Sequence, residues 1–518
     1  MPTVPSTAPV TEPAFQDLPA LLARHGRERP LAAALRQGEV AWNYAELDAW
    51  IDRVAATLQR QGLGPGDAIA VCAGSSLAYV AVFMGALRAG LVVAPLAPGS
   101  TPAQLVAMAQ DADARILFLD AAVADMAVAW PVSLQQVRLD DATFDAWLAP
   151  VASRPQPVAI NPVWPFNIIY SSGTTGTPKG IVQPHAMRWA HIQRAGLSGY
   201  DAATVTMIAT PLYSNTTLVC LIPTLAFGGC AVLMAKFDAL QYLQLAEAHR
   251  ATHTMLVPVQ YRRLMAHPDF DRFDLSAFRN KFSTSAPFLA ELKQEVLQRW
   301  PGALVEYYGL TEGGGTCILQ AHLHPHKLHT VGQPAEGHDL RLIDEDGVEI
   351  ARTPGGASAG SGEVVGRSPG MMSGYHKQPA LSAAAQWFDA EGRRYIRTGD
   401  VGRFDEDGFL ILHDRRKDMV ISGGFNIYPS DLEAVLRQNP AVADVAVVGV
   451  PSAEWGETPV AFVVRRVGAA DDAEALRQWC NAQVGKTQRL HALRLIGELP
   501  RSAIGKVLKR ELRDGWTE

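Results

Sequence analysis

Residues 166–180 read FNIIY followed by SSGTTGTPKG, an apolar run that predicts a β-strand leading into a loop of glycine and hydroxyl residues. Glycines allow backbone N–H groups to approach an anion, hydroxyls donate further hydrogen bonds, and Lys179 supplies positive charge. The loop differs from the P-loop consensus because it lacks the Gly-Lys-Ser/Thr ending. The segment predicts a phosphate-binding loop at the end of a strand, and a flexible polar surface loop is the alternative.

Helix and strand patterns alternate on the N-terminal side of this loop. Asn43 and Glu46 have the spacing of a capping box, which marks the start of a helix. Apolar residues then recur at helical spacing, and residues 68–73 and 92–96 read as buried strands. Alternation of this kind builds parallel sheets covered by helices, so we expect an α/β protein.

The pattern changes twice along the rest of the chain. Residues 340–414 contain short strand-like runs separated by Asp/Gly turns, which predict a β-rich subdomain. After residue 415 the pattern is mixed, with a helix near Pro429 and a strand at 445–450. We therefore expect a loose arm at 1–14, a large N-terminal domain of helix-covered sheets at 15–414, and a small, mobile α+β C-terminal domain at 415–518.

The composition is that of a soluble globular protein with more than one domain. The 518 residues exceed the size of a usual single core, about 100–200 residues. Net charge is −6 without a basic stripe, which argues against nucleic-acid binding. Five dispersed cysteines without metal-ligand spacing, and a start that lacks a signal-peptide pattern, predict a cytoplasmic protein. The most apolar stretch, 79–96, is interrupted by Arg88 and is too short to cross a bilayer.

Four further segments follow the loop in a fixed order. They read YYGLTE at 307–312, YIRTGD at 395–400, DRRKD at 414–418 with SGGFN at 422–426, and PRSAIGK at 500–506. Together with residues 171–180, these segments resemble the signatures of the adenylate-forming superfamily, which includes acyl- and aryl-CoA synthetases, luciferases and the adenylation domains of peptide synthetases. The resemblance extends from the region of Tyr44 to Arg510.

The resemblance implies a role for each motif residue. The phosphate-binding residues would be Ser171, Ser172, Gly173, Thr174, Thr175, Gly176 and Lys179. Tyr308 would lie against adenine, Asp400 and Arg415 would bind the ribose, and Thr311 would contact the α-phosphate. Glu312 would hold Mg²⁺, a hard cation that prefers oxygen ligands. Lys506 would stabilise the adenylation transition state, Lys417 would occupy the interdomain hinge, and Gly423 and Gly424 would line the CoA tunnel.

The same resemblance implies a reaction in two steps. A carboxylate attacks the α-phosphate of ATP and gives an acyl-adenylate and pyrophosphate, and a thiol then displaces AMP. In the family, the small domain rotates between the steps, so that Lys506 leaves and the Gly423–Gly424 loop arrives. The short tail after Lys506 favours CoA as the acceptor. Transfer to a separate carrier protein is the alternative, and a nucleotide-binding protein without ligase activity is a third hypothesis.

The acid itself is suggested by two segments. Residues 211–216 (PLYSNT) contain no acidic residue. By the resemblance, amino-acid-activating members usually carry an Asp in this segment to bind the amine, so its absence argues against an α-amino acid. Ser214 stands where acyl- and aryl-CoA synthetases commonly carry His. Three consecutive glycines after Glu312 remove side-chain volume and predict a roomy pocket for a bulky aryl, cyclic or medium- to long-chain acid. The expected acyl pocket consists of Tyr213, Ser214, Asn215, Ser285, Ala286, Gly313, Gly314 and Gly315.

Overall fold

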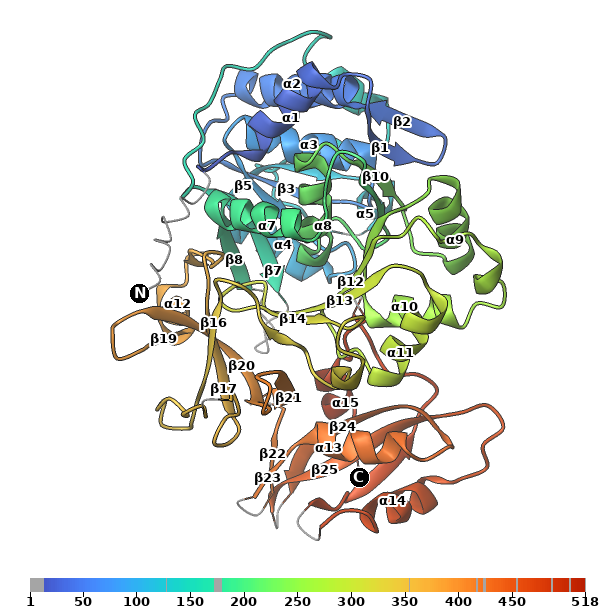
Figure 1. Ribbon diagram of the computed structural model, residues 1–518. Helices are drawn as coiled ribbons and strands as arrows, with labels where there is room; N and C mark the ends of the chain where they lie inside the picture. The colour runs from blue at the N-terminus through green and yellow to red at the C-terminus, as the bar shows by residue number, and fades with distance from the viewer. Residues whose placement is uncertain are drawn as a thin grey trace, which may run out of the picture.

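The computed structural model describes residues 14–126, 128–171, 179–353, 355–415, 418–422, 425–452, 455–485, 488–502 and 505–517. Its strands form four sheets, and helices pack against them (Figure 1). The helices of the large N-terminal part are α1 (Leu18–Glu28), α2 (Tyr44–Arg60), α3 (Leu77–Arg88), α4 (Pro102–Asp111), α5 (Ala121–Ala124), α6 (Ala142–Trp147), α7 (His185–Leu197), α8 (Asn215–Ala226), α9 (Ala239–Ala248), α10 (Pro258–Met265), α11 (Ala290–Arg299) and α12 (Pro379–Ala384).

Two large sheets build most of the N-terminal part. The seven-stranded sheet has the order β18 (Gly374–Tyr375), β8 (Lys179–Pro184), β7 (Pro165–Ser171), β4 (Val92–Pro95), β3 (Ala68–Cys72), β5 (Ala114–Leu119), β6 (Gln135–Arg138). The nine-stranded sheet has the order β15 (Gln333–Pro334), β14 (Cys317–Gln320), β13 (Ala303–Tyr308), β12 (Asn280–Ser283), β11 (His253–Leu256), β9 (Val205–Ile208), β10 (Cys230–Leu233), β1 (Ala33–Gln37), β2 (Val40–Asn43). Their central strands pair in parallel, which confirms the expected α/β architecture.

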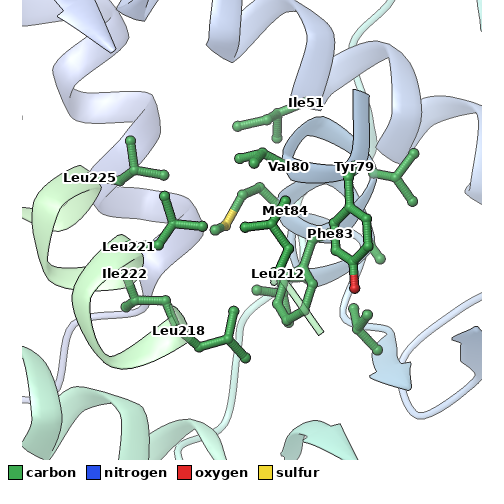
Figure 2. Close-up of a cluster of buried hydrophobic side chains, with 14 of the residues drawn as sticks. Ile51, Tyr79, Val80, Phe83, Met84, Leu212, Leu218, Leu221, Ile222 and Leu225 are labelled. Atoms are coloured by element: carbon green, nitrogen blue, oxygen red, sulfur yellow. The ribbon is translucent and has the colours of Figure 1, made fainter. Parts of the chain in front are cut away.

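The core between these sheets explains why the segment at 79–96 is so apolar. Helix α3 is buried around most of its circumference, and its Phe83 and Met84 belong to one buried cluster with Ile51 of α2 and Leu221 of α8 (Figure 2). A helix that is apolar on every side belongs inside a large domain when it is too short to span a membrane. Across the described residues, the structure contains no helix of the length and hydropathy needed for a membrane span.

The contact between α2 and α3 depends on two local sequence features. The predicted capping box is present at the start of α2, where Asn43 Oδ1 accepts from the backbone N of Glu46 at 2.9 Å and Glu46 Oε2 accepts from the backbone N of Asn43 at 2.8 Å. Gly85 of α3 then lets the two helices approach, because a Cβ there would lie 2.5 Å from Val54 Cγ1. The cap fixes where α2 begins, and the glycine fixes how closely α3 packs on it.

Two smaller sheets complete the fold. One contains β16 (Asp339–Ile343), β17 (Gly362–Arg367), β20 (Arg394–Phe404), β19 (Gln386–Phe388) and β21 (Leu410–Arg415). The other contains β23 (Phe425–Ile427), β22 (Val420–Ser422), β25 (Gly456–Arg465), β24 (Val442–Ser452) and β26 (Ala492–Leu495), with helices α13 (Pro429–Arg437), α14 (Ala473–Asn481) and α15 (Lys509–Asp514). The short helices η1 (Phe270–Arg272) and η2 (Pro325–Lys327) lie in connections. The small C-terminal α+β unit and the β-rich unit before it match the expected fold class (Figure 1).

Candidate active site

One large cavity runs between the N-terminal sheets and the C-terminal unit. Its volume is about 2780 Å³, well above the roughly 300–1,000 Å³ of a site for one drug-sized ligand, so it has room for a nucleotide and an acid together. Its lining residues lie between positions 95 and 514 and come from both the N-terminal part and the C-terminal unit. The predicted site residues that line it are Lys179, Tyr213, Ser214, Asn215, Ser285, Ala286, Tyr308, Thr311, Glu312, Gly313, Asp400 and Lys506.

Tyr308 and Asp400 meet at one wall of this cavity. Tyr308 ends β13, Asp400 lies on β20, and the Tyr308 hydroxyl donates to Asp400 Oδ2 at 2.9 Å. Burial, together with the nearby Asp400 carboxylate, raises the pKa of Tyr308 well above its ordinary value, so the phenol keeps its proton. The bond joins the nine-stranded sheet to the β-rich sheet and holds the Asp400 carboxylate at the cavity.

Thr311 and Glu312 occupy the loop that follows β13. Glu312 Oε1 accepts from the Tyr375 hydroxyl at 2.9 Å, and Lys179 Nζ lies 5.6 Å from the centre of the Tyr375 ring. Burial and the Glu312 carboxylate raise the pKa of Tyr375. Tyr375 thus links the strand after the phosphate loop to the carboxylate. We did not predict it from sequence, since only its tertiary contacts reveal its place.

Gln183 holds the backbone of the loop that contains Thr311 and Glu312, from the side facing away from the cavity. Its Nε2 donates to the carbonyl O of Thr311 at 2.7 Å, and its Oε1 accepts from the guanidinium of Arg188. Arg188 Nη2 also donates to Asn167 Oδ1 at 2.9 Å, and burial lowers the pKa of Arg188 to about 9. This buried polar chain orients the Thr311 region without touching the cavity. Sequence reasoning missed it, because a single buried Gln in a strand carries no motif.

The acyl side of the cavity contains the expected residues from two segments. Ser214 is the N-cap of α8, and its Oγ accepts from the backbone N of Thr216 at 3.2 Å. Ser285 has the left-handed φ of 79°, and its hydroxyl lies 2.7 Å from Thr216 Oγ1. A left-handed serine costs conformational energy unless neighbours hold it, and such strain is typical of binding sites. The Thr216 contact joins the two acyl-side segments.

The interpretation that three glycines after Glu312 enlarge the acyl pocket is wrong. A Cβ on Gly313 would lie 2.0 Å from the carbonyl O of Gly370, and one on Gly314 would lie 2.8 Å from the carbonyl O of Gly366. A Cβ on Gly315 would lie 2.4 Å from Leu340 Cγ. Gly314 and Gly315 pack against β17 and β16 of the β-rich sheet, whereas Gly313 lines the cavity beside Gly370. Gly313 and Gly314 also have left-handed φ values of 75° and 88°. The glycines therefore permit close packing of the backbone.

Lys506 reaches the cavity on a hairpin of the C-terminal unit. Arg501 and Val507 form a β-bridge, and Arg501 Nη1 donates to the carbonyl O of Gly505 at 2.7 Å. Gly505 has a φ of 76°, and a Cβ on it would lie 2.7 Å from Val259 Cγ1 of α10. The hairpin therefore rests directly on the N-terminal part, with Lys506 beside the contact.

An ion-pair bridge reinforces this contact. Asp444 Oδ2 lies 2.6 Å from Arg501 Nη2 and 3.6 Å from Arg262 Nη1. Asp444 and Arg501 belong to the C-terminal unit, whereas Arg262 lies on α10. The bridge connects α10 to the hairpin that carries Lys506. Sequence reasoning missed Arg262 and Asp444, because ion pairs between distant segments leave no spacing signal.

Several predicted residues lie outside the described part of the chain. They are Ser172, Gly173, Thr174, Thr175, Gly176, Lys417, Gly423 and Gly424. The structure places the flanks of the predicted phosphate-binding loop, since β7 ends at Ser171 and β8 begins at Lys179. Arg415 lies opposite Asp400 in the β20–β21 register.

Comparison with known proteins gives consistent results over nearly the whole chain. The family model described as "AMP-binding enzyme" matches residues 22–376, and that described as "AMP-binding enzyme C-terminal domain" matches residues 431–506. An indoleacetate–CoA ligase of Aromatoleum aromaticum is 31% identical over 96% of this chain and 98% of its own length. A fatty acid–[acyl-carrier-protein] ligase, ScoC, of Streptomyces coeruleorubidus is 30% identical over 97% of each chain. The crystal structure of ATP-bound MatB from Rhodopseudomonas palustris superposes with a TM-score of 0.86 at 29% identity, and covers 96% of this chain and 99% of the other.

Proposed function

Since this chain belongs to the AMP-binding enzyme family and is an AMP-forming acid–CoA ligase of its acyl- and aryl-CoA synthetase branch, we propose that it activates a bulky aryl, cyclic or medium- to long-chain carboxylic acid. The products are an acyl-CoA thioester, AMP and pyrophosphate. The aryl assignment is supported by the name of the indoleacetate–CoA ligase relative. The observation that carries the proposal is that Tyr308, Glu312, Asp400 and Lys506 line one cavity with the acyl-side residues.

The first half-reaction follows from the charges around this cavity. A carboxylate oxygen of the acid attacks the α-phosphorus of ATP, and the bond to the bridging oxygen breaks as pyrophosphate leaves. Lys506 and Thr311 stabilise the negative charge that builds on the α-phosphate oxygens. Asp400 accepts hydrogen bonds from the ribose hydroxyls, and Tyr308 holds that carboxylate in place.

Mg²⁺ fits the residues present at this site. Glu312 offers a carboxylate at the cavity, and a single protein carboxylate together with phosphate oxygens is a usual way to bind Mg²⁺. The Tyr375 hydroxyl bonds one carboxylate oxygen and orients the group. The bound cation would neutralise phosphate charge, while the chain's own part is to hold the Glu312 carboxylate toward the phosphates.

The second half-reaction requires different groups at the acyl carbon. A thiolate attacks the carbonyl carbon of the acyl-adenylate, and AMP leaves with the bridging oxygen. We assign the unit at 415–518 as the mobile domain, with Lys417 at the hinge and Gly423 and Gly424 at the thiol tunnel. Rotation would separate Gly505 from Val259 and carry Lys506 out of the cavity.

The acceptor is CoA in this proposal, and a carrier protein is the alternative. The carrier-protein hypothesis draws on ScoC, whose name specifies an acyl-carrier-protein acceptor. One assay, in which pre-formed acyl-adenylate is supplied to the enzyme, distinguishes the two acceptors. AMP release that is accelerated by free CoA supports the proposal, whereas release that accelerates only with a phosphopantetheinylated carrier protein contradicts it.

The acid class is tested by a panel of carboxylic acids. Acid-dependent pyrophosphate release should be fastest with aryl, cyclic or medium- to long-chain acids and slow with acetate. A preference for acetate or for α-amino acids would contradict the assignment. The acid that gives the fastest release in this panel is the substrate with which the variants described below are assayed.

A further inference from the structure

Arg194 of α7 is a cation that lines the cavity. Its guanidinium lies 5.6 Å from the centre of the Tyr307 ring, and Nη1 donates to Thr316 Oγ1 at a long 3.4 Å. Arg194, Tyr307 and Thr316 all line the cavity. In the part of the chain that the structure describes, no carboxylate forms a salt bridge with Arg194. Burial lowers the pKa of Arg194, and the nearby Tyr307 only partly opposes this shift.

Other buried cations of the same protein have close acceptors. Lys293 forms a buried ion pair with Glu306, Lys281 Nζ donates to three backbone carbonyls at 2.6–3.0 Å, and Arg188 donates to the side-chain oxygens of Asn167 and Gln183. The hydrogen bond from Arg194 to Thr316 is longer than these, at 3.4 Å. A buried charge without such a partner is costly, which is why most are paired or solvated. Arg194 departs from this pattern at a position that opens onto the proposed substrate cavity. This difference indicates that the group that pairs with the Arg194 guanidinium is supplied by a ligand.

The neighbours of Arg194 cannot neutralise it. Burial, with a smaller contribution from Arg194, lowers the pKa of His338 to about 4, and His338 Nδ1 accepts from the backbone N of Thr316 at 3.0 Å. Burial also lowers the pKa of His191 well below its ordinary value, so both imidazoles are neutral near pH 7. Among the described residues, His191 Nδ1 has no hydrogen-bond partner. His191 lines the cavity as well, so it is a second polar group there with unused hydrogen-bonding capacity.

The wall beside Arg194 is flat and aromatic. The Tyr307 ring stacks on Phe282, with centroids 5.5 Å apart, and Phe282 stacks on Tyr200 at 6.0 Å. Tyr307 immediately precedes Tyr308, and Thr316 follows Glu312 by four residues. The Arg194 guanidinium therefore lies in the wall of the cavity beside a stack of aromatic rings, and Tyr307 connects it in sequence to the predicted adenine-binding Tyr308.

We propose that Arg194 binds a second carboxylate, carried by the acid substrate at the end remote from its reacting carboxyl group. A guanidinium matches a carboxylate with two parallel hydrogen bonds, and a neutral His191 can donate a third. The apolar body of the acid would lie along Tyr307 and Phe282. The substrate class is therefore a dicarboxylic acid with an apolar spacer. This inference rests on the proposed function and specifies which acids that function uses.

The test compares matched acids in the full-length protein. The probes are straight-chain dicarboxylic acids of four to ten carbons and the isomeric benzene- and phenylene-diacids. Each is compared with its monomethyl ester and with the analogue that carries a terminal hydroxyl. The readout is kcat/KM for acid-dependent pyrophosphate release. At the best spacer length, we expect the dicarboxylic acid to exceed its ester by at least about ten-fold, as one charge-assisted bidentate contact allows.

Two variants assign this preference to Arg194. Arg194→Gln removes the charge and should reduce the ratio of diacid to ester at least ten-fold, whereas Arg194→Lys should keep part of it. Arg272→Gln is the matched control, because Arg272 is an exposed arginine on η1, away from the cavity, and the ratio should stay unchanged. Isothermal titration of the diacids, without ATP, gives a second readout that needs no turnover.

The outcomes separate this inference from the proposed function. Pyrophosphate release with monocarboxylic acids but with none of the diacids would overturn the inference and leave the ligase assignment standing. Equal loss of diacid and ester turnover in Arg194→Gln would also overturn it, because Arg194 would then be structural. If the hydroxyl analogues were turned over as fast as the diacids, the claim that Arg194 recognises a negatively charged group would be overturned. If none of the acids, mono- or dicarboxylic, stimulated pyrophosphate release, that result would instead overturn the proposed function.

Discussion

The side of the cavity where we propose that the nucleotide binds and the side that carries the proposed catalytic Lys506 are built differently. On the nucleotide side, Tyr308 bonds Asp400 and Tyr375 bonds Glu312, all within the N-terminal part of the fold. On the lysine side, Lys506 is held by a hairpin that rests on Val259 of α10 through Gly505. The first side belongs to joined sheets, whereas the second depends on a contact between separate units.

This difference suggests a division of labour. Buried hydrogen bonds between sheets break only when those sheets separate, so the groups that would bind ATP keep their geometry through both half-reactions. A glycine contact and a partly exposed Arg262–Asp444–Arg501 bridge are weak enough to break reversibly. The lysine side can therefore be present for adenylation and absent for thioester formation.

The largest expected effect is on the lysine side. Lys506→Ala removes the charge that we place at the α-phosphate, and acid-dependent pyrophosphate release should fall by about 10³-fold, or about 4 kcal/mol in barrier. Thioester formation from supplied acyl-adenylate and CoA should change less than about three-fold. Rapid-quench measurement of each half-reaction checks this. Equal slowing of both steps would contradict the proposal that the C-terminal unit rotates between the half-reactions and removes Lys506 from the cavity.

A substitution on the nucleotide side should instead damage the fold. Gly314→Leu places a side chain against the carbonyl O of Gly366 in a backbone conformation with φ of 88°, and should lower the free energy of unfolding by about 3 kcal/mol. Gly392→Leu is the matched control, because Gly392 has a similar φ of 74° and nothing within 4 Å of its Cβ position. Urea denaturation of both variants gives the comparison. If Gly314→Leu is as stable as the control and only changes acid preference, the glycines do line the acyl pocket.

The ion-pair bridge should have a smaller and selective effect. Asp444→Ala breaks the bonds to Arg262 and Arg501, so the hairpin is placed less often, and adenylation should slow about ten-fold. Thioester formation should be unaffected or slightly faster, since the adenylation arrangement is destabilised. Stopped-flow pyrophosphate detection measures the first step. Asp269→Ala, which breaks the exposed pair with Arg272, is the control and should change neither step.

The smallest effect is expected for one hydroxyl on the nucleotide side. Tyr308→Phe removes the bond to Asp400 and should raise KM for ATP about four-fold, or about 0.8 kcal/mol, with both half-reactions affected through nucleotide affinity. Tyr79→Phe is the control, because the buried Tyr79 hydroxyl has no hydrogen-bond partner among the described residues. An unchanged KM in Tyr308→Phe would show that Asp400 does not need this partner.

Much of the fold could be predicted from sequence because the signals were local. The cap at Asn43, the apolar periodicity of α2 and α3, and the strands at β3, β4 and β7 depend on neighbours within a few residues. The motif residues Tyr308, Glu312, Asp400 and Lys506 could also be named in advance, and the cavity contains all four.

The errors and omissions arose where the cause was tertiary. The glycines at 313–315 were predicted to leave space for the acid, whereas in the structure Gly366, Gly370 and Leu340 occupy the space that their side chains would fill. Gln183, Tyr375 and Asp444 carry no motif, and each acts through partners from distant parts of the chain. A sequence pattern shows which groups a reaction needs, but the residues that position those groups emerge only from packing.

The central claim is that the bridge at Asp444 acts on catalysis solely by placing Lys506. A double-mutant cycle on the rate of adenylation, with Asp444→Ala, Lys506→Ala and the double variant, tests it most directly. The account predicts that Asp444→Ala slows adenylation about ten-fold in the wild-type background and has no further effect once Lys506 is alanine. The same ten-fold loss in both backgrounds would contradict the account, because the bridge would then serve the reaction independently of the lysine.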